Sequence, residues 1–243
     1  MRMLVINPNT SATVTTRLCG HLAPLLPGWQ LEPVTARFGG NYIASEAGYA
    51  IAAHAVLDAW SSVPATHDAL LVGCFGDPGL AALREVSGKP CFGLAESSML
   101  EAARLGSFAI VTGGERWAVM LQRLALGLGL GKQLRGIRVL KETGGQLLAE
   151  ADGGLHKIGE AAREAHECFA ADSVIIGGAA LAGIGDRLAE SLDFRMIDNV
   201  SAAARALREV ETATTAGLPG GDSTQYSGLS VELLARLRAV HDL

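Results

Sequence analysis

One cysteine in this sequence stands where a protein can use a thiol for chemistry. Cys74 ends the segment DALLVGC, an apolar run typical of a buried strand, and the segment FGDPG that follows is typical of a tight turn. The free amides of such a turn, and the N-terminus of a helix that begins near residue 78, lower the pKa of a thiol and bind an anion. We therefore predict that Cys74 is a reactive group, in preference to a buried structural cysteine.

The chain repeats this segment further on, with a glycine in place of the cysteine. The segment DSVIIGG, which ends at Gly178, begins at residue 172, an offset of 104 residues from residue 68, where DALLVGC begins. At nearly the same offset, LVIN at 4–7 corresponds to AIVT at 109–112. A repeat of this length predicts two similar α/β lobes rather than a solenoid. Main-chain amides of the second turn can form an anion or oxyanion cradle, and those expected to do so belong to Gly178, Ala179 and Ala180.

Polar groups follow other apolar runs as well. Asn7 ends the first run, and its side-chain amide can orient a carboxylate or an amide, so we favour substrate contact over a purely structural role. Thr112 and the amide of Gly113 are expected to bind substrate. For Ser45, which precedes a helix, capping and a place in the site are equally good interpretations. Two further expected substrate contacts lie in the turn after the cysteine, Phe75 and Gly76.

Other kinds of active site are not indicated. No Ser-His-Asp motif, metal-ligand cluster or P-loop is visible, the GxGxxG spacing is absent, and the 6 histidines share no motif. We therefore expect no metal and no cofactor. A thiol in an amide-rich pocket suits proton transfer at a carbon next to a carbonyl, because amides stabilise the enolate-like charge while the cysteine moves the proton.

Short apolar runs alternate with helical patterns, which predicts βαβ units with parallel strands. We expect a first lobe at 1–96, completed by 211–243 with a last helix at 230–240, and a second lobe at 97–210. Ligands of parallel sheets bind outside the carboxyl ends of the strands, so the site is expected in the cleft between the lobes. The predicted strands are 2–7, 30–35, 68–73, 90–94, 107–112, 136–141, 172–177 and 194–198. The predicted helices are 11–26, 45–62, 78–87, 97–105, 115–129, 153–170, 180–192 and 200–210, and 211–228 is predicted to be a long surface excursion.

Composition favours a globular enzyme that acts on a small molecule. The 243 residues are 49% hydrophobic and 19% charged, with a net charge of -5 and no basic cluster, so nucleic acid and anionic membranes are not expected partners. No apolar run is long enough to cross a membrane, and the start lacks a signal-peptide pattern, so we expect a cytoplasmic protein with reduced cysteines. We also expect a homo-oligomer.

Four motifs resemble those of the aspartate/glutamate/hydantoin racemase superfamily, in particular its hydantoin and allantoin racemase branch. They are INPNTS at 6–11, CFGDPGL at 74–80, VTGGERW at 111–117 and IGGAALAG at 176–183, and together they extend over nearly the whole chain. The resemblance implies a cofactor-independent isomerase with two pseudosymmetric lobes. It also implies a cysteine from each lobe on opposite faces of the substrate carbon, one taking the proton and the other returning it.

Carried over to this chain, the first cysteine is Cys74, whereas the second falls at Gly178, which can neither donate nor accept a proton. The leading hypothesis is a racemase of a hydantoin-like or amino-acid-derived small molecule. The alternatives are a one-cysteine decarboxylase or lyase that resembles arylmalonate decarboxylase, and a binding protein that kept the cleft without turnover. A further alternative is that the glycine was introduced in the laboratory.

Overall fold

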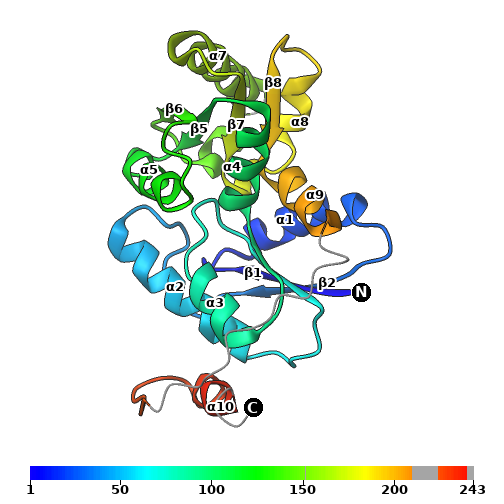
Figure 1. The fold of residues 1–243 in the computed structure, drawn as a ribbon, viewed down its shortest axis with the longest axis vertical. Coiled ribbons are helices and arrows are strands. Elements are labelled where there is room, and N and C mark those ends of the chain that lie inside the picture. Colours follow the sequence, from blue (N-terminus) through cyan, green and yellow to red (C-terminus); the bar gives the residue numbers. More distant parts are fainter. Residues whose placement is uncertain (151, 210–223, 240–243) are drawn as a thin grey trace.

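Two parallel β-sheets of four strands each form the framework of the molecule, and helices cover them (Figure 1). The computed structural model describes residues 1–150, 152–209 and 224–239. The first sheet contains β1 (Arg2–Asn7), β2 (Gln30–Thr35), β3 (Ala69–Val72) and β4 (Cys91–Gly93). The second contains β5 (Phe108–Gly113), β6 (Leu134–Leu140), β7 (Ser173–Gly177) and β8 (Arg195–Asp198). All eight predicted strands are confirmed, with ends that differ by at most two residues.

The two sheets have the same topology. Their strand orders are β2-β1-β3-β4 and β6-β5-β7-β8, and every neighbouring pair is parallel. The duplication extends beyond the strands, because Gly79 and Gly183 both have positive φ, 74° and 82°, and each precedes a helix. The predicted fold of two similar α/β lobes is therefore confirmed.

The helices follow the predicted pattern, with two differences. The predicted helix 180–192 is a 3-10 turn (Ala179–Leu181) and a short helix, α8 (Ile184–Ala189), because Gly183 interrupts it in the left-handed region. A further helix, α6 (Gly144–Ala149), was not predicted. The others are α1 (Ala12–Leu25), α2 (Glu46–Ser61), α3 (Leu80–Ser87), α4 (Leu94–Leu105), α5 (Trp117–Gly127), α7 (Asp152–Phe169), α9 (Asn199–Glu209) and α10 (Val231–Ala239).

One hydrophobic cluster joins the two lobes. It contains Met3 and Leu71 from the first sheet together with Phe108 and Ile175 from the second, all fully buried. Two smaller clusters lie on the outer faces of the sheets, one in each lobe. Because this cluster contains residues of both sheets, the two lobes pack against each other through a shared core.

The lobe boundary and the chain end bear on the predicted domains. Residue 97 lies inside α4, the helix that connects the two sheets. The last helix, α10, packs on α2 of the first lobe, with the guanidinium of Arg236 5.1 Å from the ring centre of Trp60. The predicted excursion 211–228 lies mostly outside the described residues.

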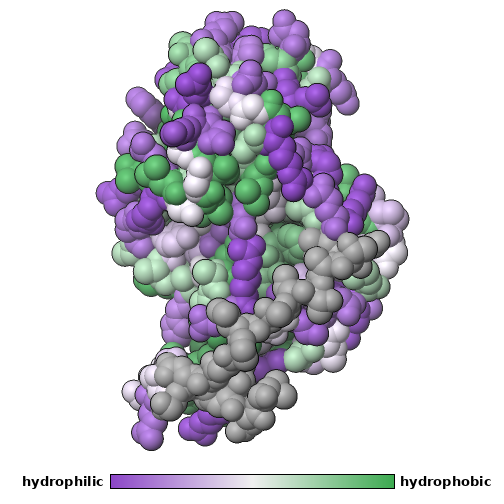
Figure 2. Space-filling view, in the orientation of Figure 1, coloured by the Kyte–Doolittle hydropathy of each residue, from purple (hydrophilic) through white to green (hydrophobic). Residues whose placement is uncertain are grey.

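Apolar side chains are exposed on two neighbouring helices. Val119 and Leu126 of α5 are 68% and 63% exposed, and Leu105 of α4 is 47% exposed. Figure 2 shows hydrophobic residues over the region that α4 and α5 occupy in Figure 1. Exposed apolar surfaces of this kind are commonly used for contacts between proteins. The homo-oligomer expected from the sequence remains a prediction. Within the described part of the chain, no helix has both the length and the apolarity needed to cross a bilayer.

Candidate active site

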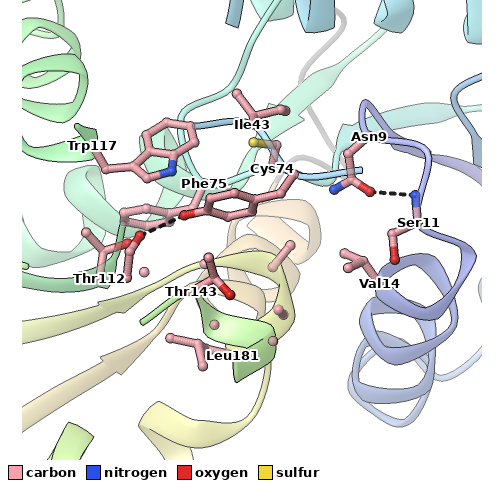
Figure 3. A pocket seen from close by; sticks show the side chains of 18 of the residues that line it. Asn9, Ser11, Val14, Ile43, Cys74, Phe75, Thr112, Trp117, Thr143 and Leu181 are labelled. Carbon is pink, nitrogen blue, oxygen red and sulfur yellow. Dashed lines mark hydrogen bonds between the residues drawn. The ribbon is translucent and has the colours of Figure 1, made fainter. Parts of the chain in front are cut away.

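A cavity of about 220 Å³ lies between the lobes, at the carboxyl ends of the strands (Figure 3). Loops that follow corresponding strands of the two sheets form its walls, so the duplication places two half-sites opposite each other. Loops of the first lobe supply lining residues within 9–14, 41–43 and 73–75, and those of the second lobe within 112–117, 143–145 and 177–181.

Cys74 lies in the wall of the first half-site. Cys74 is only 7% exposed, and Figure 3 shows its sulfur between Trp117 and Asn9. The carbonyl of Cys74 accepts hydrogen bonds from the amides of Gly76 and Asp77, at 3.0 and 3.1 Å, which fixes the tight turn that the sequence predicted. The thiol is therefore held by a rigid turn at a strand end and lines the cavity.

The protonation state of Cys74 differs from the sequence-based expectation. Burial raises the pKa of the thiol well above its usual range, and the carboxylate of Asp77 raises it further. The helix that follows, α3, begins only at Leu80. The prediction that the turn lowers this pKa was wrong, because desolvation and a nearby negative charge outweigh the effect of the turn. At neutral pH, Cys74 is a neutral thiol, the form that donates a proton.

Gly178 occupies the corresponding position in the second half-site. Its φ of +134° lies in a region that other residues rarely adopt, yet a Cβ there would have only the side chain of Leu181 near it, at 3.7 Å. The side-chain amide of Asn199 donates to the carbonyls of Ile176 and Gly178, at 2.7 and 3.2 Å, and holds this strand end. The place of a second cysteine is therefore open space next to the cavity.

Seven of the ten predicted site residues line the cavity. They are Cys74, Phe75, Thr112, Gly113, Gly178, Ala179 and Ala180. Ser45 does not line it, and instead caps α2 by accepting a hydrogen bond from the amide of Gly48 at 3.1 Å. Gly76 is also outside the lining, with its carbonyl accepting from the hydroxyl of Tyr49 at 2.9 Å.

Asn7 is fully buried beneath the cavity and organises the first loop. Its amide nitrogen lies 3.1 Å from Asn9 Oδ1, 3.0 Å from the Ser11 carbonyl and 2.9 Å from Thr15 Oγ1. Its Oδ1 accepts from the amide of Asn9 at 3.1 Å. These bonds place Asn9 and Ser11 in the lining, whereas Asn7 itself does not reach it.

We expect Asn7→Ala to act mainly on stability. The substitution removes the hydrogen bonds of the Asn7 side chain and leaves the buried amide of Asn9 without its acceptor, which lowers the free energy of unfolding by about 1–3 kcal/mol. Urea denaturation measures this. Asn41→Ala, an exposed lining residue of a neighbouring loop, is the matched control and is expected to change stability by less than about 0.5 kcal/mol. Unchanged stability with lost activity in Asn7→Ala would instead place Asn7 in contact with substrate.

Two loops that line the cavity were not predicted from the sequence. Asn41, Tyr42 and Ile43 follow β2, and Thr143 with the two glycines after it follows β6. The signal was present, because both loops come after predicted strands whose carboxyl ends had to face the cleft. Thr143 also begins the missed helix α6 through a capping box with Gln146, a pattern that the sequence contains.

Aromatic side chains of each lobe rest on glycines of the other. A Cβ on Gly177 would lie 2.3 Å from the Phe75 ring, and one on Gly76 would lie 2.4 Å from the Trp117 ring. The hydroxyl of Tyr42 donates to the Gly113 carbonyl of the second lobe at 3.0 Å. Phe75, Trp117 and Tyr42 all line the cavity, so these contacts fix both the spacing of the lobes and the shape of the site.

A polar cluster joins the lobes elsewhere. His21 Nε2 of α1 lies 3.3 Å from Asp186 Oδ2, 3.7 Å from Asp198 Oδ1 and 3.2 Å from Ser201 Oγ. His21, Asp186 and Asp198 are close enough together to hold a metal ion, a grouping that the sequence did not indicate. None of them lines the cavity, so in this structure they form an inter-lobe contact away from Cys74.

The cavity lining is uncharged. Among the described residues that form it, there is no lysine, arginine, histidine, aspartate or glutamate; its polar groups are the Cys74 thiol, the Trp117 indole N–H, hydroxyls, side-chain amides and the main chain. The hydroxyls and side-chain amides come from Asn9, Ser11, Asn41, Thr112 and Thr143, with the phenol of Tyr42. Such a site can hold carbonyls and N–H groups by hydrogen bonds, and it offers no counter-charge to a substrate ammonium group.

Known proteins place this chain in a family. The sequence pattern of the Asp/Glu/Hydantoin racemase family matches residues 3–207. A hydantoin racemase from Pseudomonas sp. (strain NS671) is 30% identical over 216 residues, 83% of this chain and 82% of that protein. An allantoin racemase from Klebsiella pneumoniae has a TM-score of 0.88 at 25% identity, over 96% of this chain and 98% of that chain. The chain therefore belongs to the Asp/Glu/hydantoin racemase family, and it is an enzyme of the isomerase class.

A decarboxylase has the same fold. A double variant of arylmalonate decarboxylase, in which a glycine is replaced by cysteine and a cysteine by serine, has a TM-score of 0.63 at 15% identity. It covers 87% of this chain and 93% of its own. This likeness concerns the fold alone.

Proposed function

We propose that this enzyme racemises a small, uncharged cyclic amide of the hydantoin type, with Cys74 as its acid and base. The uncharged cavity lining carries this proposal. Aspartate and glutamate would each bring carboxylates and an ammonium group into the cavity, and burying an ammonium group without a counter-charge costs several kcal/mol. A neutral ring of carbonyls and N–H groups needs only the hydroxyls and main-chain groups that line the site.

In the proposed mechanism, the proton moves at the ring carbon next to a carbonyl. When that carbon has lost its proton, the negative charge moves to the carbonyl oxygen, where the amides of Gly178, Ala179 and Ala180 can stabilise it. The Cys74 S–H bond breaks as a new C–H bond forms, which leaves a thiolate. In the reverse direction the thiolate takes the proton back.

The face opposite Cys74 has no second thiol. We assign proton transfer on that face to a water molecule, because Gly178 leaves space there and has no group that could act. A water molecule at neutral pH is a poorer base than a thiolate, so we expect racemisation to be limited by this face.

A one-cysteine decarboxylase is the second candidate. Two observations favour it: the open space at Gly178, which could receive a carboxylate that leaves as CO₂, and the neutral thiol of Cys74, which is already in the proton-donating form. Release of CO₂ would leave an enolate, to which Cys74 would add a proton from one face.

A panel of substrates distinguishes these functions. Purified enzyme is given single enantiomers of hydantoins, allantoin, aspartate and glutamate, and optical rotation is followed; arylmalonates are tested separately for CO₂ release. We expect racemisation of one or more neutral compounds. For aspartate and glutamate we expect a kcat/KM at least about 10²-fold lower than for the preferred neutral compound. Preferred turnover of either amino acid would overturn the proposed substrate class. CO₂ release without racemisation would favour the decarboxylase.

A further inference from the structure

The turn that carries Cys74 contains a buried carboxylate on a strained backbone. Asp77 is 4% exposed and has a φ of 54°. Among the described residues, Ala170 is the only other non-glycine residue with positive φ. Residues in this region persist where the surrounding structure holds them, and they are often found at functional sites. Asp77 lies outside the cavity lining, and the proposed mechanism does not use it.

The contacts of Asp77 explain how this conformation is held. Oδ1 accepts a hydrogen bond from the amide of Ala95 at 3.0 Å, and Oδ2 accepts one from the amide of Glu96 at 2.6 Å. Both amides are in the first turn of α4. A Cβ at position 93 would lie 2.2 Å from Asp77 Cγ, so the carboxylate fits only because that residue is Gly93. Asp77 thus ties the turn after Cys74 to the helix that connects the lobes.

Charged and titratable groups surround Asp77 on several elements. Glu96 on α4 disfavours its ionisation and Arg84 on α3 favours it, and these two side chains form an ion pair of 2.9 Å. Tyr49 on α2 and Cys74 on its own turn also face it. Burial is the largest effect and raises the pKa of Asp77 to about 7. The carboxyl group is therefore neutral well below pH 7 and negative above it.

We propose that Asp77 is a positioning residue for Cys74: its buried carboxylate fixes the turn that carries the thiol on the first turn of α4, and it places a negative charge in the same turn as the sulfur. The consequence for catalysis rests on the proposed role of Cys74. The effect of Asp77 on the Cys74 thiol does not rest on that role, because it can be measured without substrate.

Alkylation of Cys74 by iodoacetamide over a range of pH tests this inference. Peptide mass spectrometry separates Cys74 from the other three cysteines. In Asp77→Asn, which keeps the side-chain size and tolerates positive φ, we expect the alkylation midpoint to move to lower pH by about one unit. The alkaline limb of the kcat/KM profile should move with it. Asp58→Asn is the control, since its buried carboxylate is paired with Arg37 at 2.9 Å and is not among the charges that raise the Cys74 pKa.

A purely structural role for Asp77 gives a different result. Loosening the turn would raise the alkylation rate at every pH and leave the midpoint in place, which would overturn the proposal. The unmodified enzyme gives a second test if Asp77→Asn does not fold. A plot of log alkylation rate against pH should flatten near pH 7, where Asp77 ionises and begins to oppose the thiolate. A straight line of unit slope through this range would also overturn the proposal.

Discussion

Replacement of Cys74 by serine is expected to lower kcat/KM for racemisation by about 10²- to 10⁴-fold, the contribution typical of a positioned acid or base. Serine is close in size to cysteine, so the 7% exposed site and its turn should stay intact. A hydroxyl holds its proton far more tightly than a thiol, and it yields no base that could take the proton back. Optical rotation of the preferred substrate measures the loss.

The chain offers a matched control for this substitution. Cys168 is exposed on α7, outside the cavity, and Cys168→Ser is expected to leave kcat/KM unchanged. Circular dichroism and thermal unfolding confirm that both variants are folded. Full activity in a folded Cys74→Ser variant would remove Cys74 from the mechanism.

Gly178→Cys is expected to raise the racemisation rate by about tenfold or more, because it supplies a fixed acid and base on the face that otherwise uses water. The space exists, since the nearest group to a new Cβ is the Leu181 side chain at 3.7 Å. The φ of +134° opposes the change, so we also expect the free energy of unfolding to fall by about 1–3 kcal/mol.

Gly178→Ala separates the two effects of this substitution. It imposes the same backbone strain and adds no thiol, so it should lose stability to a similar degree without gaining activity. If Gly178→Cys racemises no faster than Gly178→Ala, the missing thiol is not what limits the reaction. In Cys74→Ser/Gly178→Cys, the single thiol would be on the other face, and the preferred direction of proton exchange should reverse.

The fold could be predicted in detail because its signals are local. The central strands β1, β3, β5 and β7 are short apolar runs that end in, or are followed by, glycine or a polar residue. The repeat ending at Cys74 and Gly178 indicated that the two lobes are similar. The missed helix α6 begins with Gly144 and Gly145, which have low helix propensity. Its capping box at Thr143 outweighs that preference.

The cavity lining could be predicted where strand ends determine it, and residues that longer loops bring to it were missed. Cys74, Thr112 and Gly178 lie at or just after the carboxyl ends of strands, so the topology places them. Tyr42 reaches the cavity through a loop whose path depends on contact with Gly113 in the other lobe, and no local pattern encodes that contact. The Cys74 pKa depends on burial, which a sequence pattern does not quantify.

The most direct measurement follows each enantiomer of the preferred substrate separately in heavy water. Proton NMR records loss of the α-proton, and polarimetry records inversion. For the enantiomer whose α-proton faces Cys74, we expect exchange to exceed inversion by about tenfold or more, because the thiolate form of Cys74 takes the proton, the resulting thiol exchanges it with heavy water, and the same thiol then returns a deuteron to the same face. For the other enantiomer, exchange and inversion should proceed at the same rate, because water removes the proton and Cys74 supplies the deuteron. The same ratio of exchange to inversion for both enantiomers would contradict a single thiol acting from one face.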